Sequence, residues 1–157
     1  MSLEERLNVE LHEAMRKNDT VRKLAIRAVK AALTEAKVAG TEAKALTDQE
    51  ELAIVARQIK QRRDSIEEFT KGNRPDLVAE EEAEIAVLLE YMPPQLDENG
   101  IRARARAVIA ELGVSDLKGI GPVMRRLSAD LRGQADGQLV NRIVRELLSV
   151  PPQGQSR

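Results

Sequence analysis

Apolar residues recur at intervals of three and four along nearly the whole chain, which is the spacing of amphipathic α-helices. Leu3, Leu7 and Leu11 begin the pattern, and it continues almost to the end of the sequence. No segment sustains the strict apolar and polar alternation of a half-buried strand. The sequence therefore predicts an all-α protein.

Cap and turn residues divide the first 92 positions into four predicted helices. Ser2 with Glu5 and Thr47 with Glu50 are capping-box signatures, and they predict the starts of the first and third helices. Asp19 is the expected N-cap of a second helix that runs to about Val38, and Pro75 is expected in the first turn of a fourth. The predicted apolar face of the second helix contains Val21, Ala25, Ala28, Ala32 and Ala36.

The segment MPPQL interrupts the helical pattern because neither proline can donate a backbone hydrogen bond and each restricts the residue before it. We therefore predict an N-terminal helical domain of about four helices at 1–92, a proline hinge at 93–96, and a C-terminal three-helix domain at 97–149. Gly113 and Gly133 are expected to end the first two helices of this smaller domain, and Asp136 to cap the third. Residues 150–157 have no core-forming pattern and are predicted to be a disordered tail.

Composition narrows the possible classes of protein. The chain has 157 residues, of which 42% are hydrophobic, so it can bury a substantial core. It has no cysteine, which favours a reducing compartment, and we expect a cytoplasmic localisation. No apolar run approaches the ~20 residues of a membrane span, and the N-terminus lacks the apolar centre of a signal peptide, so we expect a soluble protein.

Groups for catalysis are sparse. His12 is the only histidine and is expected on the exposed side of the first helix, so a histidine-based nucleophilic triad with a cysteine cannot be assembled, and neither can a nitrogen- or sulfur-rich metal site. No phosphate-binding loop or dinucleotide fingerprint occurs. We expect no metal, no cofactor and no catalysis by this chain alone.

One arginine falls inside a predicted apolar arc. Arg62 lies between Ile59 and Ile66 on the third helix, and Glu81 and Glu84 lie within or beside the apolar arc of the fourth. If the two helices form a hairpin, a partly buried ion pair follows. The pair either fixes the register of the helices, because an unpaired buried guanidinium would be costly, or belongs to an internal ligand site.

Basic residues gather in two places. On the second helix, Lys23, Arg27 and Lys30 share one side, where they could neutralise phosphates or form an ordinary solvated face. Gly119 and Gly121 could admit an anion at a helix start or could simply shape a turn. The candidate RNA-binding residues of the C-terminal domain are Lys118, Arg125, Arg126, Arg132, Asn141, Arg142 and Arg145.

Four segments together resemble one family. They are IKQRRDSIEEF from Ile59, RPDLVAEEEAEIAVLLEYMPPQL from Arg74, GPVM from Gly121 and RGQADGQLVN from Arg132. The combination is similar to the GatB/YqeY family, and the last third resembles the tail domain of the aminoacyl-tRNA amidotransferase B subunit. The resemblance implies an all-helical two-domain fold, tRNA contact by the tail, and an association with carbon-nitrogen ligases that use glutamine as amido-N-donor. Asp130 and Gln134 depart from the pattern, since related sequences often carry Lys or Arg at these positions.

Three functional hypotheses follow. The first is a non-catalytic helical protein that binds tRNA, or a tRNA-linked complex, through the C-terminal domain with help from the second helix. The second is a protein-interaction module that docks on an enzyme, such as an amidotransferase or another translation-linked protein. The third is an accessory subunit of a glutamine-dependent carbon-nitrogen ligase.

Overall fold

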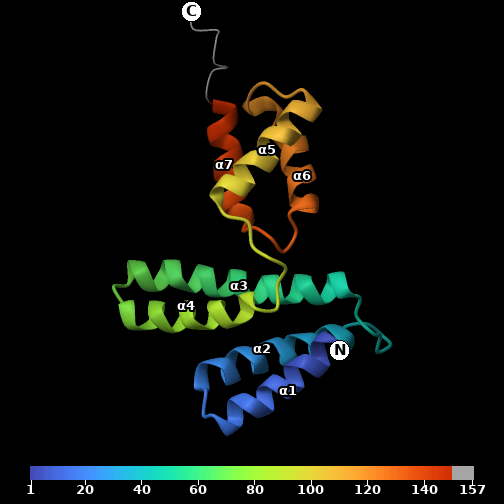
Figure 1. Cartoon of the computed structure of the whole chain (residues 1–157), viewed down its shortest axis with the longest axis vertical. Coiled ribbons are helices and arrows are strands. Elements are labelled where there is room, and N and C mark those ends of the chain that lie inside the picture. Colours follow the sequence, from blue (N-terminus) through green and yellow to red (C-terminus); the bar gives the residue numbers. More distant parts are fainter. Residues whose placement is uncertain (150–157) are drawn as a thin grey trace, which may run out of the picture. The chain divides into compact units, whose positions relative to one another are not determined.

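The computed structural model describes residues 1–149, and their regular structure consists of seven α-helices and one short 3-10 helix, without a strand. The prediction of an all-α protein is confirmed. Contacts divide the chain into a first compact unit, Met1–Pro93, and a second that begins at Pro94. The predicted tail at 150–157 lies outside the described residues. Figure 1 shows the helices in chain order.

The first unit contains α1 (Leu3–Arg16), α2 (Thr20–Lys37), α3 (Asp48–Lys71) and α4 (Pro75–Leu89). Both predicted capping boxes form, because Ser2 and Thr47 accept hydrogen bonds from the amides of Glu5 and Glu50, whose carboxylates accept in return. Asp19 caps α2, and Pro75 occupies the first turn of α4. The local signals in the sequence therefore decide where these helices start.

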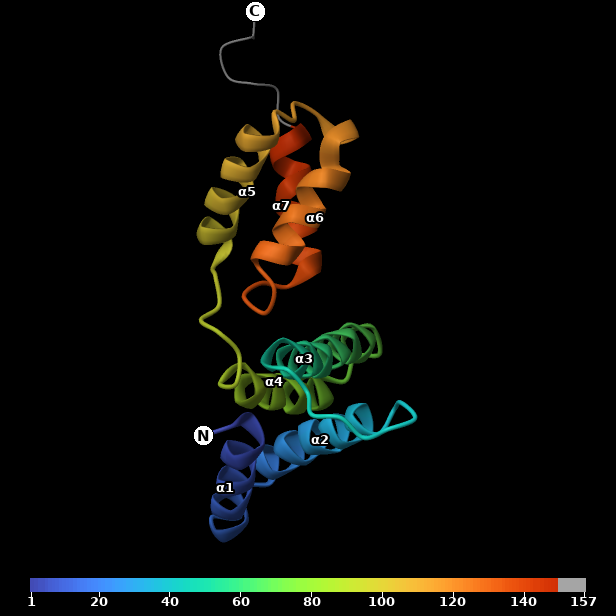
Figure 2. The same cartoon turned by 90° about the vertical axis from the view of Figure 1, so that its right-hand side faces the viewer.

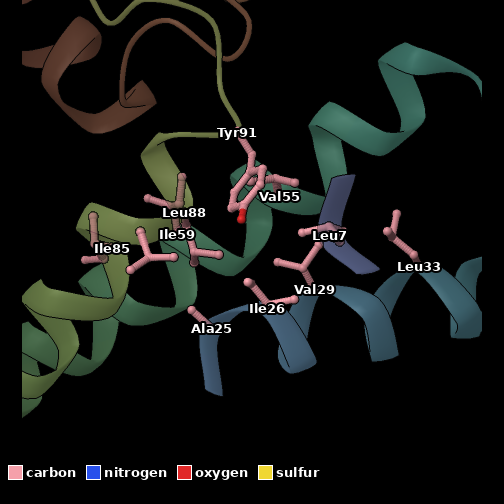
Figure 3. Packing of buried hydrophobic residues seen from close by; sticks show 11 residues of the cluster. Leu7, Ala25, Ile26, Val29, Leu33, Val55, Ile59, Ile85, Leu88 and Tyr91 are labelled. Carbon is pink, nitrogen blue, oxygen red and sulfur yellow. The ribbon is translucent and has the colours of Figure 1, made fainter. Parts of the chain in front are cut away.

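The four helices form two hairpins, α1 with α2 and α3 with α4, and α2 packs on both α3 and α4 (Figures 1 and 2). The core between the hairpins is almost wholly aliphatic, with Tyr91 at its edge just after α4 (Figure 3). Its buried members include Leu7, Ala25, Ile26, Val29, Leu33, Val55, Ile59, Ile85, Leu88 and Tyr91.

The buried side of α2 differs from the predicted one. Ile26, Val29 and Leu33 are the most deeply buried residues beside Ala25, whereas Ala28 and Ala32 are only partly covered. The larger side chains fill the space toward the core, where burial of their extra methyl groups stabilises more. Ala32 and Ala36 of the predicted face instead line a groove together with Ile54 of α3.

The second unit contains α5 (Glu98–Leu112), the 3-10 helix η1 (Leu117–Gly119), α6 (Ile120–Asp130) and α7 (Gly137–Ser149). Each α-helix packs on both others. Gly113 ends α5 with a φ of 67°, a left-handed conformation that glycine adopts without steric cost. The buried core consists of Ile101, Ala105, Val108, Val123, Leu127, Leu131, Val140, Ile143, Val144 and Leu148.

No helix among residues 1–149 is long and apolar enough to cross a membrane. The same part of the chain brings together no group of three or more His, Cys, Asp or Glu side chains that could hold a metal ion. His12 is exposed on α1.

Candidate nucleic-acid interface

Several arginines of the second unit are held by carboxylates on or beside α5. Arg126 of α6 reaches Glu111 at 3.2 Å and Asp130 at 3.0 Å, and these hydrogen bonds and charges raise the pKa of its guanidinium, Asp130 contributing most. Arg142 of α7 lies 2.7 Å from Glu98. Arg102 of α5 lies 3.2 Å from Glu146 of α7. Ion pairs therefore connect α5 to α6 on one flank and to α7 on the other.

The remaining predicted cations of this unit are exposed and form no ion pair within the described residues. They are Lys118 in η1, Arg125 in α6, Arg132 in the connection from α6 to α7, and Arg145 in α7. Arg145 donates a hydrogen bond of 2.8 Å from Nε to Oδ1 of Asn141, one turn earlier, which orders the side chain without neutralising its charge. The structure thus separates the predicted basic set into neutralised and available members.

The available members belong to η1, α6, α7 and the connection between α6 and α7. Successive residues of an α-helix are about 100° apart, so Arg125 points away from the flank where Arg126 meets α5. Arg145 lies three residues after Arg142 on the same side of α7, but only Arg142 forms ion pairs, with Glu98 and Glu146. Lys118 belongs to η1, which contacts both α6 and α7. We call Lys118, Arg125, Arg132 and Arg145 the α6–α7 face.

The two departures from the family pattern have identifiable contacts. The charge of Asp130 is directed to Arg126, so it is largely compensated. The backbone carbonyl of Gln134 accepts a hydrogen bond of 2.9 Å from the amide of Leu96, which ties the start of the unit to the α6 to α7 connection. Neither contact withdraws a charge from the α6–α7 face.

The two glycines ahead of and within α6 differ in their surroundings. A Cβ at Gly119 would lie 2.5 Å from Cγ1 of Val114, whereas one at Gly121 would meet nothing within 4 Å. Gly119 is therefore needed for a close turn, which supports the turn-shaping interpretation at that position. Nothing comparable restricts Gly121.

The candidate residues of α2 are also available. Lys23, Arg27 and Lys30 form no ion pair within residues 1–149; Arg27 is exposed, and the two lysines are partly covered. Lys37, further along the same side, is paired with Glu4 of α1. We call Lys23, Arg27 and Lys30 the α2 stripe.

The structure places Arg62 against the two acidic residues of α4 that the sequence singles out. Its Nη2 lies 3.5 Å from Oε1 of Glu84, and the two side chains are only 13% and 18% exposed. Nη1 donates to the backbone and side-chain oxygens of Gln58, while Nε is buried without a hydrogen-bond partner. Burial, followed by the negative charge of Glu84, raises the pKa of Glu81. The contacts of Arg62 connect α3 and α4, which favours a role in helix register over a ligand site.

A second polar network joins α1, α2 and the end of α4. The Tyr91 hydroxyl donates to Glu10, and Arg6 pairs with Glu10 at 3.1 Å while its guanidinium carbon lies 4.6 Å from the Tyr91 ring centroid. Arg22 pairs with Glu90 at 2.7 Å. Burial and the Glu10 carboxylate raise the pKa of Tyr91. Sequence reasoning missed this network; only the Arg6 and Glu10 pair, four residues apart on one helix, could have been found from spacing.

The fold defines a class: small all-helical proteins of two compact units. Comparison with known protein families identifies the family within this class. A model of the Yqey-like protein family matches residues 4–148, and the chain belongs to that family.

Several similar curated proteins are fungal and share one name, altered inheritance of mitochondria protein 41, mitochondrial. The protein from Pyrenophora tritici-repentis is 30% identical over 91% of this chain and 79% of its own length. Those from Lachancea thermotolerans and Saccharomyces cerevisiae strain YJM789 are each 34% identical, over 70% and 55% of this chain. The matches span 59% and 46% of these two yeast proteins, less than two thirds of each.

These names correct one expectation. The absence of cysteine led us to expect a cytoplasmic protein, but the similar proteins are named as mitochondrial, so that prediction is wrong. The physical reason is that cysteine usage reports redox conditions and not a compartment, and reduced thiols do not distinguish one reducing compartment from another.

Proposed function

We propose that this protein binds structured RNA of the tRNA type without acting on it chemically, and that the α6–α7 face makes the contact. One observation carries the proposal. In a unit where Arg102, Arg126 and Arg142 are all paired with carboxylates, the four cations of the α6–α7 face keep their charges available. Neutralisation of phosphates by such cations releases counterions and drives nucleic-acid association.

The aromatic content favours double-helical regions of RNA over single strands. The chain has one tyrosine and one phenylalanine, and Tyr91 is buried in the core of the first unit. Recognition of unpaired bases relies on stacking with aromatic side chains, whereas double-helical RNA is read by its shape and backbone. A cationic face without aromatic residues suits the second mode.

The test compares neighbouring arginines. Binding of tRNA to Arg125→Gln/Arg145→Gln and to Arg126→Gln/Arg142→Gln is measured by fluorescence anisotropy across a salt series. Both variants have two fewer positive charges, so total charge is matched. We expect the first pair to weaken binding by about tenfold or more near 50 mM salt and to reduce the salt slope by about two, roughly 0.9 for each phosphate that the protein no longer neutralises.

The matched variant should bind nearly as well as the unchanged protein, because its arginines are already neutralised by Glu111, Asp130 and Glu98. An equal decrease in both variants would mean that only net charge matters. Affinity for tRNA that does not depend on salt, or that equals that of an acidic control protein, would remove the proposal.

A further inference from the structure

The α2 stripe is a second cationic surface, on a different compact unit from the α6–α7 face. Lys23, Arg27 and Lys30 are spaced four and three residues apart, which keeps them on one side of the helix. With a rise of 1.5 Å per residue, they span about 10 Å along the axis. A duplex carries a phosphate for roughly every 1.7 Å of its axis, so several phosphates fall within this length.

Neighbouring charges leave the stripe positive. Lys37 lies on the same side of α2, further along the helix, and pairs with Glu4 of α1. The carboxylate of Glu4 is thereby neutralised. Asp19, at the start of α2, is occupied by the amide of Arg22 and by its guanidinium at 3.6 Å. Both carboxylates are therefore committed to other partners, and the three cations of the stripe keep their charge.

The connection between the two units is short. The amide of Met92 still bonds to the carbonyl of Leu89 at the end of α4. On the other side, the Gln95 side chain and the Leu96 amide bond to the backbone carbonyls of Gly133 and Gln134. Only Pro93 and Pro94 separate these two anchored ends. A short connection gives two linked binding surfaces a high effective concentration for one ligand.

We propose that the α2 stripe contacts the phosphate backbone of the same RNA that the α6–α7 face holds, so that the protein binds one double-helical RNA through both units. The inference rests on the proposed function and adds to it a second contact surface and a bivalent mode. Each surface alone offers few phosphate contacts, and two linked surfaces bind more tightly than either alone when both engage one RNA.

The first arm of the test removes the charges of the stripe in the full chain. Lys23→Gln/Arg27→Gln/Lys30→Gln is compared with Lys44→Gln/Lys60→Gln/Lys71→Gln, a control that removes the same charge from lysines paired with neighbouring carboxylates. We expect the stripe variant to bind a tRNA at least tenfold more weakly at low salt, with a salt slope reduced by about two to three. The control should change affinity less than threefold. Circular dichroism checks that both variants are folded.

The second arm inserts about twenty Gly and Ser residues between Pro93 and Pro94 in the full chain. Because effective concentration falls roughly as the −3/2 power of linker length, we expect tRNA affinity to decrease about tenfold or more. The insertion should have no effect on the stripe variant, which has only one surface left. An unchanged or increased affinity of the otherwise unaltered protein would show that the two surfaces do not share one RNA.

The outcomes separate the two proposals. If Arg125→Gln/Arg145→Gln abolishes binding and the stripe variant does not, the bivalent mode is overturned and the proposed function stands. If neither variant weakens binding, both proposals are wrong. If the stripe variant keeps its tRNA affinity but no longer binds vesicles of anionic phospholipid, the stripe is a membrane contact and the inference is overturned.

Discussion

The two units of this protein use charge in opposite ways. In the first, polar groups penetrate the edge of the core, where Arg62 meets Glu84 between α3 and α4 and Tyr91 donates to Glu10 between α4 and α1. In the second, the core is entirely aliphatic and the ion pairs lie on the exposed flanks of α5. A buried polar contact constrains which helices may pair, because an unpaired partner is costly. Exposed ion pairs add little stability, but they determine which cations remain without a carboxylate partner and can bind an anion.

The difference suggests a division of tasks. The first unit obtains specificity of helix pairing from groups that are difficult to replace one at a time. The second is held chiefly by apolar packing, because the ion pairs that connect its helices are exposed and add little stability. Substitutions in the two cores and at the buried polar groups test this contrast. The expected loss in free energy of unfolding is largest in the cores and smaller at the polar groups.

Ile143→Ala should unfold the second unit selectively. Ile143 is fully buried in the aliphatic core of this small unit, and a large-to-small change there destabilises by about 2 to 5 kcal/mol, much of the stability that so small a core supplies. We expect urea denaturation followed by circular dichroism to show an early partial transition, while the fluorescence of the single tyrosine, Tyr91 in the first unit, keeps its midpoint.

Ile26→Ala is the matched change in the first unit, and it should lower the Tyr91 midpoint instead. If Ile143→Ala shifted the Tyr91 transition equally, the two units would unfold as one cooperative body and the contrast would disappear.

Arg62→Met should destabilise the first unit by about 1 to 3 kcal/mol, because Glu84 would remain partly buried beside Glu81 without a cation. The double variant Arg62→Met/Glu84→Leu should recover most of this stability, since apolar groups of similar volume replace the pair and the unpartnered Nε disappears. Chemical denaturation gives the midpoints. An unchanged midpoint in Arg62→Met would mean that the arginine is simply solvated.

Tyr91→Phe should destabilise the first unit by about 1 to 2 kcal/mol, because Glu10 no longer accepts a hydrogen bond from the hydroxyl while the ring and its contact with Arg6 remain. Because the pKa of Tyr91 is raised in the folded state, the stabilisation by its hydroxyl is constant through neutral pH. It decreases only above about pH 10, the pKa of tyrosine in the unfolded chain. Since the variant has no tyrosine, thermal unfolding is followed by circular dichroism. A difference between the two proteins that changes between about pH 6 and pH 8 would contradict this assignment.

Glu81→Gln should stabilise the protein slightly. Because burial raises the pKa of Glu81, the folded state binds its proton more tightly than the unfolded state, and stability decreases as pH rises through that titration. Removing the charge should therefore add less than about 1 kcal/mol at neutral pH and nothing below about pH 3, where the group is protonated in both states. Glu82→Gln on the exposed side of α4 is the control and should have no effect. Melting temperatures at the two pH values provide the measurement.

Much of the fold could be predicted because its signals are local. Ser2 with Glu5, Thr47 with Glu50, Pro75 and Gly113 act within one helical turn, and the structure has each of them in its expected role. The buried side of α2 was harder to predict, because alanines and larger aliphatic residues occupy adjoining sides of that helix. Only contact with α1 and α4 selects Ile26, Val29 and Leu33.

The candidate interface, too, could be predicted from the sequence only in part. The sequence identifies which residues carry positive charge, and helical spacing places Lys23, Arg27 and Lys30 on one side of α2. It does not distinguish Arg125 from Arg126, adjacent residues of the same type. The structure pairs Arg126 with Glu111, fifteen residues earlier, and leaves Arg125 available.

By itself, the sequence determined the all-helical class, the starts of the first four helices, the end of α5 and the resemblance to the family, because caps, prolines and apolar spacing act over a few residues. It misplaced the end of α6, which stops at Asp130 with Leu131 as its C-cap and not at Gly133. Tertiary structure alone decided which cations are neutralised, that Glu84 is the residue ion-paired with Arg62, and that Tyr91 holds Glu10. These outcomes depend on side chains that are distant in the chain and meet only after the helices pack, since charge and hydrogen bonding act over a few ångström in space.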